Sequence, residues 1–574
     1  MAFVVYRGTP GVQEDRLLRI LDFFGVPSAR VDVDALDASS LAGAGPFAVL
    51  GSVEAVAAGL TNPSSAAHLQ QAAAIFAFAG DDRDAARRGV TRLCGGEWTW
   101  TTPDRPVIEI CASDPEFTGV MSGLRAEGHV STLQPVLTPA GPSAAAGIVL
   151  MDGRPALFRA RVGDAPTYIC SSAEIPDLDA PVEKNYYDVR THFLAAVPLV
   201  MFIASVFREV MWRPRELGAC LIIDDPLLKH RYGFCDFPWL RDRMRERRFT
   251  TNIAFIPWNW RRTSQRASEF FRSESDLFSV SIHGCDHIAA EFGTTSLDVL
   301  DRRARLAQAR MQQHRARTRI AHDPVMVFPQ GVFSAECPAV LKHNEFIAAV
   351  NTEISPVGET TANTRIRDVW DVAILRYGSF AIYTRRYERH GLENFAFDLL
   401  LGKPCFIVAH HDEFRDGAPQ LLSLIDRLQT LPCMLTWRSP GDVVRRACRV
   451  RNGEDLQARM YGSQLLLTNA GPRPSVYHVH KVERQPASVS GVTVDDRDIN
   501  WSVAGEDIVF PCVVPARGEI LIHVRYRDES RGQTSDSVKY QLAVAARRVL
   551  SEFRDEYVRK LQPAPSPVGV HERH

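Results

Sequence analysis

The segment Leu221-Ile222-Ile223-Asp224-Asp225-Pro226 reads as an apolar β-strand that ends in two adjacent carboxylates. Polar residues just beyond a buried strand commonly lie at the C-terminal mouth of an α/β barrel, where active sites are built. Two neighbouring carboxylates are costly to bury unless a cation neutralises them. Taken alone, the pair is more simply explained as a solvated strand end, so a metal site requires further ligands elsewhere in the chain.

A second apolar strand, about 60 residues later, supplies such ligands in the sequence Ser279-Val280-Ser281-Ile282-His283-Gly284-Cys285-Asp286-His287. The spacing of four places both imidazoles on one face if the turn after the strand is helical. Two histidines and one carboxylate form a common open zinc site, which leaves positions for water and substrate. The histidine pair is a weak signal by itself, but together with the strand-end Asp-Asp it predicts a metal centre.

The surrounding chain has 574 residues, which predicts two to four domains. Strand-like and helix-like stretches alternate around the two motifs over a length that suits an α/β barrel. We therefore expect an α/β protein with a distorted (β/α) barrel and two flanking domains. The expected order is an N-terminal α/β domain of flavodoxin-like or glutamine-amidotransferase-like outline at 1–185, a linking helix at 186–216, the barrel at 217–450, a β-sandwich at 453–535, and a helix with a Pro-rich tail at 536–574.

The amino-acid composition argues against some classes of function for this chain. The formal net charge of -1 gives no reason to expect nucleic-acid binding. The 11 cysteines contain no CxxC pair, so neither a disulfide framework nor a cysteine zinc site is indicated. The apolar run Phe193–Phe207 is too short to span a bilayer and contains Pro198, which favours a buried helix. No secretory signal is recognised at the N-terminus. We therefore expect a cytoplasmic location and no association with a membrane.

The order and separation of the two motifs resemble those of the polysaccharide deacetylases of the chitooligosaccharide deacetylase type. Their first motif is a strand ending in Asp-Asp, here IIDDP, and their second is H-(S/T)-x-x-H, here HGCDH. The segment Phe328-Pro329-Gln330-Gly331 looks like their third motif region. The strand from Cys405, which ends in His410-His411-Asp412, looks like their last motif. The resemblance covers about residues 217–450.

The resemblance implies a role for each matching residue. Asp225, His283 and His287 would hold a divalent metal, and Asp224 would be the general base. Zn²⁺ suits such ligands, and Co²⁺, Fe²⁺ or Ni²⁺ suit them also. Either His410 or His411 would protonate the leaving amine; strand alternation means that only one of the two can face the mouth.

The implied substrate is an N-acetylated glycan or oligosaccharide, from which the metal-dependent hydrolase would remove the acetyl group. Trp258 and Trp260 could stack on sugar rings, although ordinary barrel packing explains them equally well. Pro329, in the third motif region, is a further candidate for substrate contact. The sequence decides neither the acyl group nor the oligomeric state.

Several positions depart from the family pattern. Pro226 stands where the family usually has Gly, and Gly284 stands where it has Ser or Thr. The third motif region VMVFPQG lacks the Arg that usually orients the catalytic Asp, while RDVWDV, with Asp368 and Asp371, faintly resembles the fourth motif. Two alternatives therefore stay open: a C–N hydrolase acting on a small non-sugar amide, and a catalytically inactive glycan-binding relative.

Overall fold

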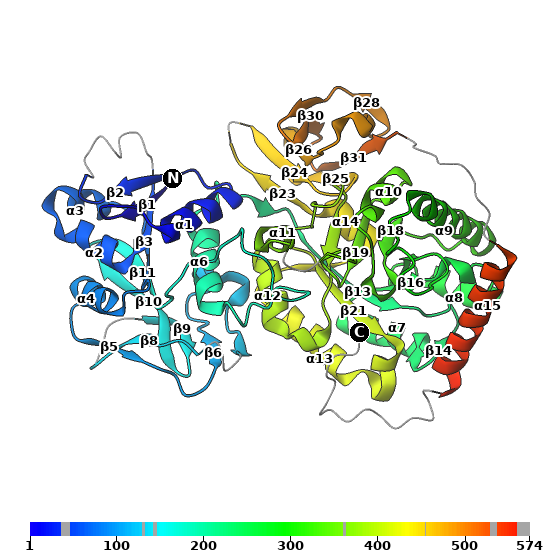
Figure 1. Ribbon diagram of the computed structural model, residues 1–574, viewed down its shortest axis with the longest axis horizontal. Helices are drawn as coiled ribbons and strands as arrows, with labels where there is room; N and C mark the ends of the chain where they lie inside the picture. The colour runs from blue at the N-terminus through cyan, green and yellow to red at the C-terminus, as the bar shows by residue number, and fades with distance from the viewer. Residues whose placement is uncertain are drawn as a thin grey trace.

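The computed structural model describes residues 1–35, 46–128, 133–141, 146–359, 363–453, 455–527 and 537–558. In these ranges the chain forms a mixed α/β architecture with an N-terminal sheet, a barrel and a β-sandwich (Figure 1). The Pro-rich tail expected after the last helix lies outside the described residues.

The N-terminal part is built on a nine-stranded sheet in the order β2-β1-β3-β4-β11-β10-β9-β6-β7. Strands β2, β1, β3, β4 and β11 run parallel, and the remaining pairs are antiparallel. The strands are β1 (Ala2–Tyr6), β2 (Ser28–Asp32), β3 (Ala48–Ser52), β4 (Ala74–Phe78), β6 (Val107–Ile110), β7 (Arg125–Glu127), β9 (Ala146–Met151), β10 (Arg154–Val162) and β11 (Ala165–Cys170), and the helices are α1 (Val12–Phe23), α2 (Val53–Thr61), α3 (Pro63–Leu69), α4 (Arg83–Cys94) and α5 (Pro115–Thr118).

Helix α6 (Phe193–Val206) coincides with the apolar run for which a buried helix is expected, and 11 of its 14 residues are buried. It contacts strand β4 and helix α5 on the N-terminal side and helix α12 (Leu392–Leu400) on the barrel side. Among the described residues no helix has the length and apolar character needed to cross a membrane. Helix α6 therefore serves as the apolar connection between the N-terminal sheet and the barrel.

The barrel has seven parallel strands in the order β20-β19-β18-β17-β16-β13-β21, and β22 (Leu435–Trp437) pairs with β13 outside this path. The bridge of Arg386, just beyond β20, to Ile407 of β21 closes the ring. In it Arg386 donates its backbone N–H to Phe406 at 2.9 Å and accepts from Val408 at 3.0 Å. The strands are β13 (Leu217–Asp224), β16 (Thr251–Phe255), β17 (Phe278–His283), β18 (Val325–Val327), β19 (Ala348–Asn351), β20 (Ile382–Thr384) and β21 (Cys405–His410).

Helices follow most of these strands, as expected for a (β/α) barrel. They are α7 (Phe237–Arg247), α8 (Gln265–Ser273), α9 (Leu297–Thr318), α10 (Cys337–His343), α11 (Ile366–Trp370), α12, α13 (Pro419–Gln429) and α14 (Pro440–Arg446). Strand β13 is buried along almost its whole length, which is typical of a parallel strand covered on both faces. Because all seven strands point the same way, their last residues meet at one mouth.

Two antiparallel-rich sheets, built mainly from the chain that follows the barrel, share one apolar core, and this pair of sheets is called the sandwich below. One contains β12 (Arg213–Pro214), β23 (Cys448–Arg451), β24 (Leu456–Met460), β26 (Ser475–Val482), β29 (Ser502–Ala504) and β30 (Asp507–Val514). The other contains β25 (Gln464–Asn469), β27 (Val489–Val494), β28 (Arg497–Ile499) and β31 (Gly518–Tyr526).

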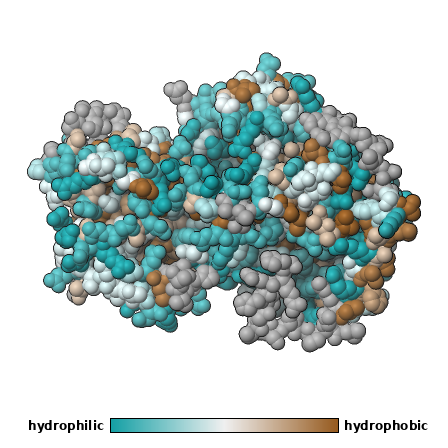
Figure 2. Space-filling view, viewed as in Figure 1, coloured by the Kyte–Doolittle hydropathy of each residue, from teal (hydrophilic) through white to brown (hydrophobic). Residues whose placement is uncertain are grey.

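Helix α15 (Val538–Phe553) and the helical turn at 554–558 return from the sandwich to the barrel, where Figure 1 shows the helix in red beside α8 and α9. Most of its large apolar residues are exposed, with Val544 buried, and Figure 2 shows brown atoms gathered over this edge of the molecule. The exposed large apolar side chains of this segment are Val538, Leu542, Val549, Leu550, Phe553, Tyr557 and Val558. The opposite, polar side of the helix faces the barrel.

Candidate functional site

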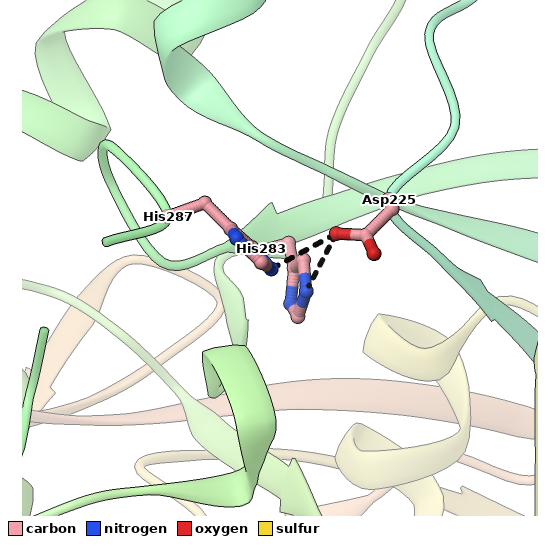
Figure 3. A group of neighbouring side chains, drawn as sticks. All are labelled: Asp225, His283 and His287. Carbon is pink, nitrogen blue, oxygen red and sulfur yellow. Dashed lines mark ion pairs between the residues drawn. The ribbon is translucent and has the colours of Figure 1, made fainter. Parts of the chain in front are cut away.

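Asp225, His283 and His287 converge at the barrel mouth (Figure 3). Asp225 directly follows β13, and His283 is the last residue of β17. Oδ1 of Asp225 lies 3.4 Å from Nε2 of His283 and 2.9 Å from Nε2 of His287. The turn after β17 is not the helical one that would place both imidazoles on one face; an irregular loop brings His287 back with a φ of 57°.

The chemistry of these three side chains fits a divalent metal. Oδ1 of Asp225 is buried and has no hydrogen-bond partner, although it faces two imidazole nitrogens. Nδ1 of His283 donates a hydrogen bond to the carbonyl oxygen of Val327 at 2.9 Å, so Nδ1 carries the proton. The lone pair of Nε2 is then available to bind a metal. Burial favours the neutral acid, but the nearby His287 and His283 hold the pKa of Asp225 well below its ordinary value.

The loop that carries His287 is held by Glu291, whose carboxylate accepts three backbone N–H groups. They come from Cys285 at 3.0 Å, Asp286 at 2.7 Å and His287 at 3.1 Å. A Cβ at Gly284 would lie 2.5 Å from Glu291 Oε2 and would also clash with Pro329, and the φ of Gly284 is +64°. This explains why glycine stands where the family pattern has Ser or Thr.

Cys285, Asp286 and Glu291 form a second group of potential metal ligands. Its carboxylates are already engaged, however: Glu291 binds the loop, and Asp286 pairs with Arg310 at 2.6 Å. We therefore assign this group to support of the His287 loop.

Asp224 lies beside the three potential ligands and is paired with an arginine that the sequence motifs do not reveal. Arg385 follows β20 and donates two hydrogen bonds to the Asp224 carboxylate, at 2.7 and 2.6 Å. Burial acts to raise the pKa of Asp224, but Arg385, with His283 and His410, outweighs it, and the net shift is downward. In the sequence, Arg385 could have been found as a site residue by its position at the end of a strand. The same position marks Asp224 and Asp225.

The two neighbouring histidines of the last motif point to different surroundings. His410 ends β21, lines the same cavity as Asp224, and places Nε2 4.0 Å from Oδ2 of Asp224. Burial lowers the pKa of His410, against the opposing effect of Asp224 and Asp225. His411 is buried beside Tyr232 and Asp555 and is not among the residues that line the cavity.

A cavity of about 850 Å³ contains the metal-ligand candidates, Asp224, Arg385 and His410. The remaining lining residues are Asn185 and residues of the segments around Gln330, Thr352 to Glu359, Tyr387 and the end of α15. The structure does not bring Trp258, Trp260 or Pro329 to its wall. Instead Arg262 and Arg261 stack over the rings of Trp258 and Trp260, and Pro329 packs near Gly284.

The segment RDVWDV also lies away from the cavity. Asp371 accepts a hydrogen bond from the Tyr461 hydroxyl at 2.7 Å and pairs with Arg449 at 3.2 Å. It therefore helps to attach the sandwich to the barrel, and the faint resemblance to a fourth motif does not correspond to a site residue here.

Comparison of the whole chain with known proteins finds similarity to several solved structures. No family model and no curated sequence matches the chain. A putative polysaccharide deacetylase from Mycobacterium smegmatis is 11% identical, with a TM-score of 0.29, and the match covers 41% of this chain and 92% of that one. A family 4 carbohydrate esterase from Streptomyces lividans, in complex with acetate, is 13% identical, with a TM-score of 0.23 and coverage of 38% and 97%.

A third match is a family 4 carbohydrate esterase from Bacillus anthracis, 11% identical, with a TM-score of 0.24 and coverage of 42% and 86%. At these scores the similarities do not decide the function, which has to be argued from the site.

Proposed function

We propose that this chain is a metal-dependent hydrolase that removes an acyl group from the nitrogen of an N-acylated, amino-sugar-containing glycan. The observation that carries the proposal is the convergence of Asp225, His283 and His287 in one cavity with Asp224 and His410. An open site of two histidines and a carboxylate is suited to hydrolysis. The glycan part of the proposal rests on the resemblance of the motifs to the deacetylases.

Asp225, His283 and His287 would hold the metal, which, when bound, polarises the acyl oxygen and makes water a better nucleophile near neutral pH. Asp224 would take the proton of the attacking water, because Arg385 keeps its carboxylate ionised and fixed in direction. His410 would then protonate the leaving nitrogen. Nε2 of His410 lies 4.0 Å from Oδ2 of Asp224, beyond direct hydrogen-bond distance, so the two groups face the same space as separate base and acid.

Arg385 supplies what the third motif region lacks. In the family an arginine of that motif orients the catalytic Asp, and here an arginine from the end of β20 has the equivalent contact with Asp224. The absence of arginine from VMVFPQG is therefore no argument for an inactive protein. This favours the hydrolase over the inactive glycan-binding alternative.

The test is metal content by elemental analysis of the wild type and His283→Ala, followed by acetate release from N-acetylated oligosaccharides. We expect about one equivalent of Zn, Co, Fe or Ni in the wild type and its loss in the variant, together with loss of acetate release. His478→Ala, a half-exposed histidine of the sandwich, is the matched control and should keep both. A wild type that takes up no metal, even from added Zn²⁺, would exclude this mechanism.

A further inference from the structure

The end of the last helix forms part of the cavity wall next to the candidate metal centre. Arg547, Arg548, Ser551, Arg554 and Asp555 all line the cavity. The chain therefore brings three arginines to this wall from a segment outside the barrel.

The positive charge of Arg554 is paired with the carboxylate of the next residue, Asp555. It pairs with Asp555 at 2.8 Å, and Asp555 also accepts a hydrogen bond from the Tyr232 hydroxyl at 3.1 Å. His411 approaches the same carboxylate at 3.6 Å. These contacts neutralise Arg554 and attach the helical turn to the barrel.

Arg548 has no such partner. Arg548 is only 5% exposed, and its Nε is buried without a hydrogen-bond acceptor. Within the described ranges no carboxylate forms an ion pair with Arg548. Glu353 and Glu359 line the same cavity, but neither is paired with it. The Arg548 side chain is therefore mostly buried, lines the cavity, and has no described carboxylate paired with it, which places its guanidinium to meet an anionic group of a bound molecule.

The helix is held on the barrel by other residues, so Arg548 is not needed for docking. Glu552 pairs with Lys229 at 2.7 Å and also with Arg262. At the other end of the helix, the Tyr540 hydroxyl donates to Asp286 at 2.9 Å.

We propose that Arg548, with the neighbouring Arg547, binds an anionic group of the substrate while the acyl amide lies at Asp225, His283 and His287. A guanidinium presents a planar fork of donors that matches a carboxylate or a phosphate or sulfate ester. The substrate class is thus an N-acylated glycan that carries negative charge, rather than a neutral one. This inference rests on the proposed function for the position of the amide, but the anion site can be tested without it.

The experiment measures the binding of sulfate, glucuronate and glucose to the full-length, metal-loaded chain by calorimetry at constant ionic strength. The variants are Arg548→Gln and Arg548→Lys, with Lys539→Gln as the matched control. Lys539→Gln removes the same charge from the same helix at an exposed position that does not line the cavity. Metal content and the melting temperature of each variant are measured in parallel.

We expect Arg548→Gln to weaken the binding of at least one anion by roughly 10-fold or more, as for loss of a charge-assisted hydrogen-bond pair. Arg548→Lys should weaken it less, and Lys539→Gln should match the wild type. Binding of sulfate alone would assign a phosphate or sulfate ester, and binding of glucuronate alone would assign a carboxylate. Glucose should not distinguish the variants.

Equal anion affinity in the wild type and Arg548→Gln would overturn the inference. If Arg548→Gln does not fold, equal affinity in Arg548→Lys and the wild type would overturn it. Failure of the proposed function looks different: the wild type would lack metal or release no acetate from any substrate, while its anion binding would still depend on Arg548.

Discussion

The Asp224–Arg385 pair sets the protonation of the candidate general base. Both side chains are buried, and two hydrogen bonds join them. Without the arginine, burial would be opposed only by His283 and His410, and the neutral carboxylic acid, which cannot accept a proton from water, would be favoured more than it is now. The pair thus keeps Asp224 ionised at a position where a lone carboxylate would be protonated more easily.

Replacement of Arg385 by Gln should therefore raise the pKa of Asp224. The base must be ionised to work, so the acid limb of the kcat/KM profile should move to higher pH, and activity should be lost sooner as the pH falls. Removal of one partner of a buried pair also destabilises by roughly 3–5 kcal/mol. The measurement is the pH profile of acetate release, and Arg385→Lys is the control that retains the charge. An unchanged acid limb in folded Arg385→Gln would contradict the role of the pair.

At the scale of single residues, the sequence predicts a site residue from its position at the end of a strand. It predicted Asp225 and His283 as site residues because strong apolar runs mark where β13 and β17 end. It did not identify Arg385, because β20 has only three residues and its place beside β21 depends on closure of the barrel. The choice between His410 and His411 required the actual end of β21.

Helix α15 is an element whose polar side faces the protein and whose apolar side faces outward. Apart from the buried Val544, its inward contacts are ionic or hydrogen-bonded, through Glu552, Tyr540 and Asp555. Sequence periodicity predicted a helix near this place but not its docking, because charged contacts at distant positions have no periodic pattern. The association with the barrel should accordingly respond to salt more than an apolar interface does.

Glu552→Gln should loosen α15, since it weakens the contacts with both Lys229 and Arg262. Partly exposed ion pairs are worth about 1 kcal/mol or less each. We expect amide hydrogen exchange in α15 to rise by about fivefold, and 1 M salt should produce a similar rise in the wild type. Helix α9 serves as the internal reference. Exchange in α15 that responds to neither the variant nor salt would mean that other contacts hold the helix.

The N-terminal sheet and the barrel share one continuous apolar core, which includes most of α6. Phe202 of α6 lies near the rings of Phe76, Tyr168 and Phe207. The sequence predicted the helix and the α/β class of both neighbours from apolar runs. The way in which they pack could not be read from it, since a helix that is apolar on all sides has no preferred face. The division into domains at 185, 216, 450 and 535 stays a prediction.

Phe202→Ala should therefore destabilise the N-terminal sheet and the barrel together. Truncation of a buried phenylalanine typically costs roughly 3–5 kcal/mol through lost burial and a cavity. The expected result in calorimetry is one transition at a lower temperature, while Val210→Ala, at a more exposed position, should change little. Two separated transitions, with only the first displaced, would show that the parts unfold independently.

The arginine-bearing wall comes from residues 547–554, whereas the last proposed metal ligand is His287. During synthesis, a chain emerging from the ribosome holds its complete set of metal ligands long before this wall has been made. On the proposed roles, the nascent protein would hold the metal ligands at a stage when it does not yet have the residues that select a charged substrate. Acquisition of the metal and acquisition of specificity would then be separate events in the life of each molecule.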